Sequence, residues 1–253
     1  SYTQLALLEE ELAANGLGAL AVEISGQLTI GAGSLLAYGT GAQKSLFLPM
    51  LSEGRLMAFG LTEVGVGVNA KKVGAYVEWD AGADCWRLFA SGDRAKLYIT
   101  NATHGALVGL VARLGQGGKQ VGLFVLELPS QDVQRGQPLA DGSLADFDFE
   151  CRPTGVSAFQ ANHNARLSFD NFPIPKQQQI EADGVEVLFY CLRLGRCMLA
   201  AMSAGYQRML AADALHFARQ RDGVGGRVVR HELPRLNLGK VLGGALQARA
   251  LSH

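Results

Sequence analysis

Eight short runs rich in β-branched and aromatic residues lie between residues 57 and 175, and they constrain the fold more than any other feature of the chain. They are MAFGLT, VGAYVEW, WRLFA, KLYIT, ALVGLVA, VGLFVLEL, DFDFEC and ARLSF. Polar and Gly-rich turns such as DAGADC and LGQGGK separate them. Many short strands at this spacing are typical of an antiparallel barrel or sandwich, so we expect a β domain here.

Helical patterns flank this region on both sides. LALLEEELAANG near the N-terminus has apolar residues at helical spacing, with Gly16 where a C-terminal cap would stand, and GAQKSLFLPMLSEG predicts a helix interrupted near Pro49. A run at 184–221 with hardly any helix breaker predicts a long helix, and another is expected from near His231. The predicted parts are a partial N-terminal helical domain (1–56), a middle antiparallel β-barrel domain (57–175) and the start of a C-terminal helical bundle (176–253).

Composition narrows the class of protein. Lys plus Arg and Asp plus Glu both total 23, so no basic field favours a nucleic-acid partner. No run of about 18 apolar residues lacks a charge or a Gly, and no signal peptide is evident, so we expect no membrane span and a cytoplasmic protein. The four cysteines show no CxxC pairing and are expected to be reduced thiols. The five histidines lack metal-ligand spacing, so no metal site is expected.

A Gly-rich turn follows the first predicted strand in LTEVGVGVNA, residues 61–70. Gly65 and Gly67 permit unusual backbone dihedrals and a close approach to a ligand. The spacing is not GxGxxG and no strand–helix unit follows, so a Rossmann site is not predicted. The hydroxyl of Thr62 and the loop amides could hold a polar heterocycle or a phosphate. An ordinary hairpin loop is the alternative.

The stretch LYITNATHG, residues 97–105, ends another predicted strand with an aromatic ring, Tyr98, and a hydroxyl, Thr100. Tyr98 could stack on a ligand or pack across strands as core. In the long helix, Arg193 and Arg196 share a face, and each has either a carboxylate partner or a solvated head group. ARQRDGVGGR suits a phosphate or a solvated interhelical turn. The triplet at 9–11, EEE, is expected on a solvated helix face.

The order of the motifs carries more information than each motif alone. GTGAQKSLFLPMLSEG, AFGLTEVGVGVNA, KLYITNATHG, LGRCMLAAMSAG and ARQRDGVGG occur in the collinear order of the acyl-CoA dehydrogenases, which the chain resembles over nearly its whole length. The resemblance implies that family's architecture of helical domain, β-barrel and helical bundle. It also implies FAD, an acyl thioester substrate carried by coenzyme A or an acyl carrier protein, and a place in fatty acid metabolism.

The resemblance assigns expected roles to particular residues. The flavin ring would lie against Tyr98, with Ile99 and Thr100 beside it and the Thr100 hydroxyl near the reactive N5. Leu61 and Thr62 match positions at the pyrimidine end of the ring. Arg196 matches a helix arginine near the active-site base, and Arg193 lies near the substrate. The remaining expected cofactor contacts are Gly67, Val68, Val224 and Arg221, the last reaching the FAD phosphates of a neighbouring subunit.

Three departures from the family pattern point to an atypical substrate or weaker FAD binding. The usual loop is TEPGxGSD, and Val68 lacks the hydroxyl that the family offers there. Val224 replaces the phenylalanine that usually follows the phosphate arginine. Arg193 stands where an acidic residue is common.

The catalytic glutamate of the family is absent from the chain. In most members it lies downstream of the last residue here, and in a minority it immediately precedes the helix arginine, where this chain has Gly195. We therefore expect a partial chain of an enzyme that removes hydrogen across Cα and Cβ of an acyl thioester, with hydride transfer to FAD N5. The alternatives are a flavin monooxygenase or oxidase of the same superfamily and a non-catalytic flavin-binding or scaffold protein. A homodimer or homotetramer and an electron-transfer flavoprotein as electron acceptor are also implied.

Overall fold

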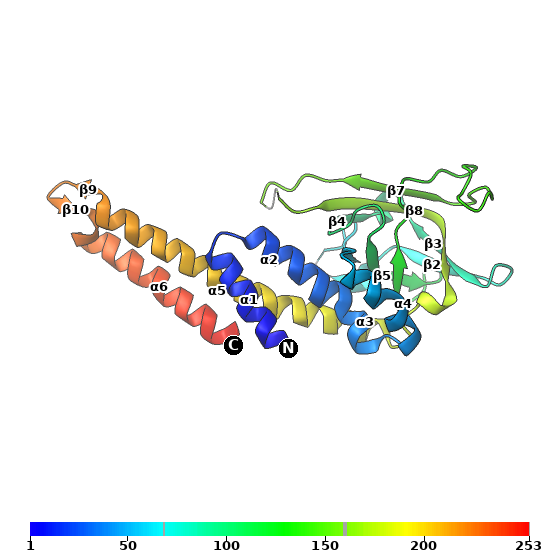
Figure 1. The fold of residues 1–253 in the computed structure, drawn as a ribbon, viewed down its shortest axis with the longest axis horizontal. Coiled ribbons are helices and arrows are strands. Elements are labelled where there is room, and N and C mark those ends of the chain that lie inside the picture. The colour runs from blue at the N-terminus through cyan, green and yellow to red at the C-terminus, as the bar shows by residue number, and fades with distance from the viewer. Residues whose placement is uncertain (68, 159–160, 253) are drawn as a thin grey trace. The chain divides into compact units, whose positions relative to one another are not determined.

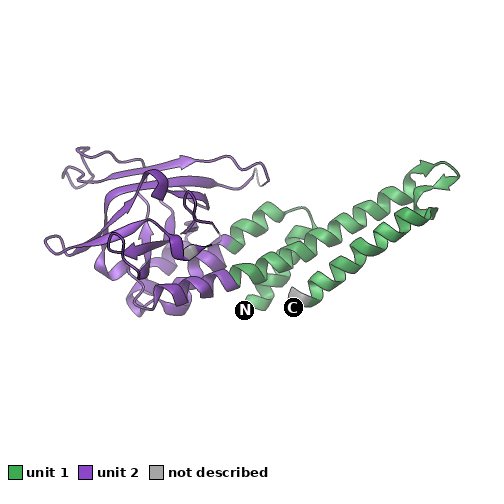
Figure 2. Ribbon diagram, turned by 180° about the vertical axis from the view of Figure 1, so that it is seen from behind, with its two compact units in different colours: residues 1–25, 194–253 green, residues 26–193 purple. Residues whose placement is uncertain are grey.

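The computed structural model describes residues 1–67, 69–158 and 161–252. It divides into two compact units, unit 1 with residues 1–25 and 194–253 and unit 2 with residues 26–193, as Figure 2 shows. The predicted boundaries at 56/57 and 175/176 follow changes of secondary structure rather than contacts. The three predicted domains therefore stay a prediction.

Unit 2 is built on an eight-stranded sheet, and each strand coincides with one of the eight β-rich runs (Figure 1). The pairing order is β1-β5-β2-β3-β8-β4, with β6 also on β5 and β7 also on β8. The strands are β1 (Met57–Gly60), β2 (Tyr76–Asp80), β3 (Cys85–Ala90), β4 (Lys96–Thr100), β5 (Leu107–Leu114), β6 (Val121–Glu127), β7 (Asp148–Pro153) and β8 (Asn164–Pro175).

The sheet is nearly closed, which confirms the predicted fold class of helices, β-barrel and helices. It differs from a purely antiparallel barrel because β5 pairs in parallel with both β1 and β2. The two ends of the pairing order are joined through Asn101, directly after β4, whose side-chain amide donates to the carbonyl of Met57 on β1 over 3.3 Å. This contact brings the end of β4 next to the first strand.

The core of unit 2 lies between the sheet and the helices that cover it. β5 and β6 are buried almost along their whole length because both of their faces are covered. Helices α3 (Ala32–Tyr38), α4 (Gly41–Ser52) and the start of α5 (Gly184–Gln220) bury Leu35, Phe47 and Val187 against the strands. A turn of π-helix at Gly26–Gly31 precedes α3. The hydrophobic burial of these side chains is the main stabilising contribution to the unit.

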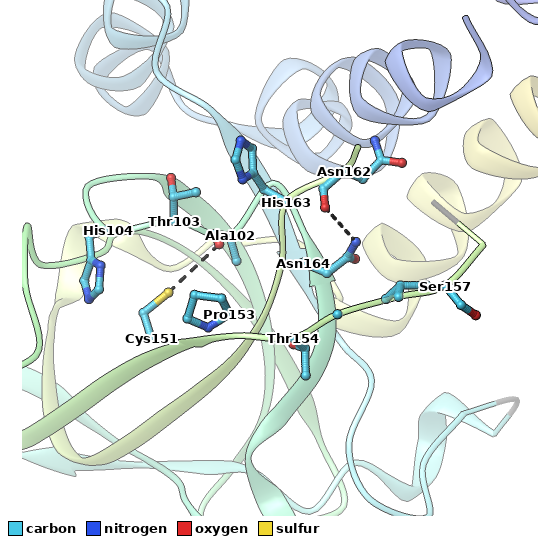
Figure 3. Close-up of a pocket in the computed structure, with 12 residues that line it drawn as sticks. Ala102, Thr103, His104, Cys151, Pro153, Thr154, Ser157, Asn162, His163 and Asn164 are labelled. Carbon is cyan, nitrogen blue, oxygen red and sulfur yellow. Dashed lines mark hydrogen bonds between the residues drawn. The ribbon is translucent and has the colours of Figure 1, made fainter. Parts of the chain in front are cut away.

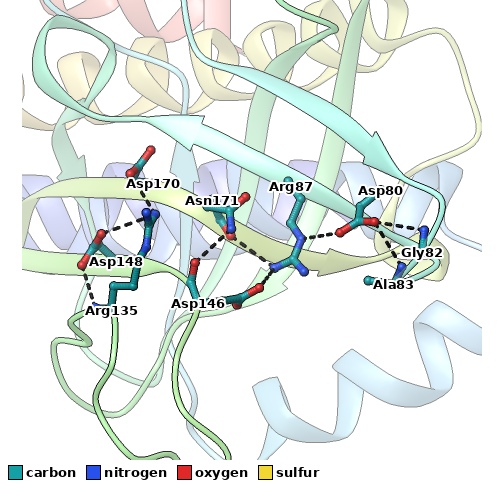
Figure 4. Close-up of polar contacts among 9 residues, drawn as sticks. All are labelled: Asp80, Gly82, Ala83, Arg87, Arg135, Asp146, Asp148, Asp170 and Asn171. Carbon is teal, nitrogen blue, oxygen red and sulfur yellow. Dashed lines mark hydrogen bonds and ion pairs between the residues drawn. The ribbon is translucent and has the colours of Figure 1, made fainter.

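Ion pairs hold the long connection between β6 and β7 onto the sheet (Figure 4). Arg87 on β3 pairs with Asp80 over 3.1 Å and with Asp146 of the connection over 2.8 Å. Arg135, also in the connection, pairs with Asp170 on β8 over 3.2 Å. The backbone amide of Ala83, followed by the guanidinium of Arg87, keeps the pKa of Asp80 below its usual value. These charges are structural, and each is paired.

Unit 1 contains α1 (Tyr2–Ala14), α2 (Gly18–Ser25), the second part of α5 and α6 (Glu232–Ser252). A small hairpin of β9 (Asp222–Gly223) and β10 (Gly226–Arg227) joins α5 to α6. The apolar core is small and rich in alanine and methionine, including Ala13, Ala201 and Met202. A Cβ at Gly205 on α5 would lie 2.2 Å from the carbonyl oxygen of Glu10, so α1 and α5 pack closely enough to require glycine there.

The glutamates at 9–11 were predicted to be solvated, and for two of them this is wrong. Glu10 is buried, and its charge is paired with Arg208 on α5 over 2.9 Å and with Arg249 on α6 over 3.4 Å. Glu11 remains exposed and pairs with Arg208 over 2.7 Å. Glu9 is fully buried, and within the described chain neither of its carboxylate oxygens has a hydrogen-bond partner. Burial raises the pKa of Glu9 to about 8.

Two helical segments, Gly18–Tyr38 and Gly184–Gln220, are long and apolar enough to cross a membrane by length and composition alone. In each, 44% of the most apolar window is buried inside the protein. Helices of a protein core pass the same test, so the finding is weak evidence for insertion. The expectation of no membrane span stays a prediction.

Candidate functional site

The structure places the loop that begins at Leu61 directly beside β4. The backbone amide of Leu97 donates to the carbonyl of Thr62 over 2.8 Å. Glu63 forms isolated backbone bridges with both Lys96 and Val66. The two segments that the resemblance predicts around a flavin are therefore neighbours, although more than 30 residues separate them in the chain.

A buried ion pair holds this loop in place. The ammonium of Lys96 lies 2.6 Å from the carboxylate of Glu63 and donates to the carbonyl of Val111 on β5 over 2.7 Å. The same carboxylate accepts from the backbone amides of Gly74 and Ala75 at 2.6 and 3.2 Å. Both side chains are buried, which satisfies the rule that buried charges must be paired and hydrogen-bonded. Desolvation lowers the pKa of Lys96, and the charge of Glu63 opposes that shift.

Tyr98 is the most unusual residue of the site. Its φ is +54°, a conformation that is uncommon for any residue with a side chain and rare for a bulky aromatic. The pairing of β4 with β8 shifts register between Lys96 and Ile99, so Tyr98 stands in an irregularity of the strand. The residue is 62% exposed. Backbone strain that presents an aromatic ring to solvent is typical of a ligand site, since folding alone gains little from it.

Thr100 places a hydroxyl two residues after this ring. Its Oγ1 donates to Oδ1 of Asn164 on β8 over 2.9 Å. The next residue, Asn101, is buried with a φ of +65°, and its backbone amide donates to the carbonyl of His163 over 2.8 Å. The end of β4 is therefore held on both sides, by β1 and by the start of β8.

The other predicted contacts in unit 2 fall into two groups. Leu61 and Ile99 are buried and form the apolar floor of this segment. Gly67 is exposed, and Gly65 has a φ of +74°, so the loop needs a glycine at 65. A Cβ at either glycine would meet no neighbouring atom, so the outer side of the loop is open. Val68 lies outside the described residues.

The arginines and Val224 are described on helix α5 and the hairpin after it. Arg193 and Arg196 are both exposed, which favours solvated head groups over buried ion pairs. Arg221 follows the last residue of α5 and is exposed, as is Val224 at the tip of the hairpin. Because Arg196, Arg221 and Val224 belong to unit 1, their contribution to the site around Tyr98 stays a prediction.

A cavity of about 660 Å³ adjoins the end of β4, and the sequence did not predict it (Figure 3). It lies between the turn after β4 and the facing ends of β7 and β8. Nε2 of His104 at its edge is 2.8 Å from Asp132, and the thiol of Cys151 donates to the carbonyl of Ala102. Burial raises the pKa of Cys151 to about 11, so this thiol is not a nucleophile at neutral pH. Asn164 forms part of the wall, so the cavity and Thr100 share one residue.

The described residues support neither a metal site nor a disulfide. No group of His, Cys, Asp and Glu in that part of the chain could hold a metal ion. The four cysteines are free thiols, and three of them are buried.

Helices, a nearly closed sheet and further helices in this order define the acyl-CoA dehydrogenase fold. The structure of glutaryl-CoA dehydrogenase from Mycobacterium smegmatis matches with a TM-score of 0.83 at 21% identity, covering 100% of this chain and 59% of that one. An acyl-CoA dehydrogenase from Bacillus anthracis, complexed with FAD, matches with a TM-score of 0.80 at 20% identity, covering 98% of this chain and 40% of that one.

The curated proteins with similar sequences are also acyl-CoA dehydrogenases. The very long-chain specific acyl-CoA dehydrogenase of Rattus norvegicus is 25% identical over 238 residues, which is 90% of this chain and 33% of that protein. The short-chain specific enzyme of Megasphaera elsdenii is 28% identical over 220 residues, 85% of this chain and 52% of that protein. No family model matches. The chain is thus related to the acyl-CoA dehydrogenases, has their fold, and spans about a third to a half of the length of these relatives.

Proposed function

We propose that this chain forms the flavin-facing part of an FAD-dependent enzyme that oxidises acyl thioesters between Cα and Cβ. The observation that carries the proposal is the strained, exposed Tyr98, two residues before the Thr100 hydroxyl, on a strand that Leu97 joins to the loop at 61–67. These groups come from two segments distant in the chain and meet at one edge of the sheet. The relatives named above support the same activity.

The residues present fit a flavin. A planar ring system needs a flat apolar contact, which Tyr98 offers, and polar partners at its edge, which Thr100 and the backbone of Thr62 offer. Open space on the outer side of Gly65 and Gly67 leaves room for a bulky group. When bound, FAD supplies the two-electron acceptor for the oxidation.

The residues of this chain would position the flavin and shield it from water. They would not exchange protons with the substrate. Leu61 and Ile99 exclude water from the floor of the site, which strengthens polar contacts there. The ion pair of Glu63 and Lys96 fixes the distance between the loop and β4. No carboxylate precedes Arg196, since Gly195 occupies that position, so the base for the α-proton is not among the matched residues. Dehydrogenation is accordingly proposed for the protein of which this chain is the flavin-facing part.

The family resemblance adds further parts to the proposal. The acyl carrier would be coenzyme A or an acyl carrier protein, the acceptor an electron-transfer flavoprotein, and the assembly a homodimer or homotetramer. A cytoplasmic location is proposed from the sequence alone. Arg193 and Arg196 are solvated cations that suit an anionic carrier group.

An oxidase is the second candidate. The structure of a prolyl acyl carrier protein oxidase, AnaB, matches with a TM-score of 0.74 at 18% identity, and Arg193 and Val68 depart from the dehydrogenase pattern. Oxygen consumption with peroxide formation from an acyl carrier substrate would favour the oxidase. Turnover only with an artificial electron acceptor would favour the dehydrogenase. The scaffold alternative would be favoured if the protein of which this chain is proposed to form the flavin-facing part retained FAD and turned over no thioester.

The test is flavin retention. Purified protein is mixed with FAD, separated from the excess by gel filtration, and its visible absorption spectrum is recorded. We expect flavin bands with the wild type and their loss in the double variant Tyr98→Ala/Thr100→Ala. Leu144→Ala, which removes a similarly exposed apolar side chain from the same unit, is the control and should retain FAD. A wild type that stays colourless, or a double variant that binds as well, would refute the proposed site.

A further inference from the structure

The hydroxyl of Thr100 has its proton committed within the protein. Thr100 Oγ1 donates to Asn164 Oδ1 over 2.9 Å. A hydroxyl carries one proton and two lone pairs, so a threonine that donates internally can only accept from anything else. Asn164, and not the ligand, therefore decides whether the Thr100 hydroxyl donates or accepts a hydrogen bond toward a ligand.

The hydrogen bonds of the structure favour one orientation of the Asn164 amide. Its Nδ2 donates to the backbone carbonyl of Asn162 over 3.5 Å, as Figure 3 shows. Rotation of the amide would bring its oxygen toward that carbonyl and its NH₂ group toward Thr100, which would lose one hydrogen bond and place two acceptors together. Two backbone contacts hold the residue itself: its Cα pairs across the sheet with that of Thr100, and its carbonyl accepts from the amide of Thr154 over 2.7 Å.

We propose that Asn164 is a positioning residue that makes Thr100 a hydrogen-bond acceptor toward the bound flavin. This inference rests on the proposed function. N5 of oxidised FAD carries a lone pair and accepts hydrogen bonds, whereas N5 of reduced FAD carries a hydrogen and donates. A hydroxyl held as an acceptor stabilises the reduced form relative to the oxidised form. The structure thus assigns to Asn164 an effect on the reduction potential of the cofactor, exerted through Thr100.

A purely structural role for Asn164 makes a different prediction. The side chain would then only hold β4 to β8, and its loss would change stability or FAD affinity without a preference between redox states. The two roles are separated by a double-mutant cycle, because an effect that acts through the Thr100 hydroxyl must vanish when that hydroxyl is absent.

The experiment uses the FAD-loaded wild type, Asn164→Leu, Thr100→Val and the double variant. The potential of the bound FAD is measured by titration with dithionite against a reference dye. In Asn164→Leu the Thr100 proton is free to donate to oxidised N5, so we expect the oxidised form to be favoured by about tenfold, which is a fall of about 30 mV for a two-electron couple. In the Thr100→Val background, Asn164→Leu should change the potential by less than a quarter of that amount.

Each other outcome counts against the inference. An unchanged or raised potential in Asn164→Leu, or an equal fall in both backgrounds, overturns it while leaving FAD binding intact. A wild type that retains no FAD overturns the proposed function and this inference together. If Asn164→Leu does not fold, Asn164→Ala serves in its place, because it leaves the backbone pairing with Thr100 unchanged and frees the same proton.

Discussion

Replacing Glu9 with glutamine should stabilise the protein at neutral pH and leave it nearly unchanged in acid. Glu9 is fully buried on α1, and neither of its carboxylate oxygens is hydrogen-bonded within the described chain. The charges on the elements packed around α1 are engaged elsewhere, since Arg208 of α5 pairs with Glu10 and Glu11, and Arg249 of α6 pairs with Glu10. Among the described residues, ionised Glu9 therefore has no compensating cation.

The magnitude follows from the pKa. Burial raises the pKa of Glu9 from 4.5 to about 8, so the folded protein keeps a proton that the unfolded chain has lost. Stability is then complete below about pH 4.5 and falls as pH rises toward 8. At about 1.4 kcal/mol per unit, roughly 3 kcal/mol has been lost by pH 7. Glutamine, which is always neutral, should recover most of that loss at pH 7 and little at pH 4.5.

The assay is urea unfolding followed by far-ultraviolet circular dichroism, at pH values from 4.5 to 8. Asp213→Asn is the control, because it removes one acidic charge from an exposed position on α5 in the same unit. We expect the gain from Glu9→Gln to grow with pH, while the control changes by less than about 0.5 kcal/mol throughout. A gain of the same size at pH 4.5 and pH 7, or no gain at either, would refute the reasoning.

Two further substitutions test the site. Lys96→Met should destabilise by about 3–5 kcal/mol, because it leaves the buried Glu63 unpaired, and adding Glu63→Gln should restore much of the loss; urea midpoints measure both, and a double variant as unstable as the single one would contradict the ion-pair argument. Tyr98→Gly should raise stability by up to about 1 kcal/mol through relief of the positive φ while weakening FAD retention. A lower melting temperature together with normal FAD binding would show that the ring serves the fold rather than the ligand.

The fold was predictable from the sequence because its signals are local. Alternation and turn residues located the eight strands of unit 2, and the lack of breakers located α5 to within a residue at its end. Local signals failed where tertiary packing decided the outcome. Helix α4 continues through Pro49 instead of breaking there, since Phe47 is buried against the core of unit 2. Glu9 is buried although its neighbours suggested a solvated face.

The sequence predicted which segments form the candidate site, and the role of their residues stays a prediction. The contacts that hold these segments together were not predictable. The resemblance named Tyr98 and Thr100, and the structure joins the strand that carries both to the loop that begins at Leu61, through the bond from Leu97 to Thr62. The ion pair between Glu63 and Lys96 joins residues 33 positions apart, and no local pattern links them. The left-handed backbone at Tyr98 arises from the register shift against β8, which only the paired strands reveal.

β8 imposes an order on folding. It is the shared partner of β3, β4 and β7, and its first residue pairs with Thr100 from 64 positions further along the chain. On the ribosome, β3 and β4 emerge well before this strand, with their hydrogen-bonding edges uncovered. The sheet cannot close until residue 175 has been synthesised, and contacts of such long sequence separation slow folding. During that interval the exposed edges are the part of the nascent chain most in need of a chaperone.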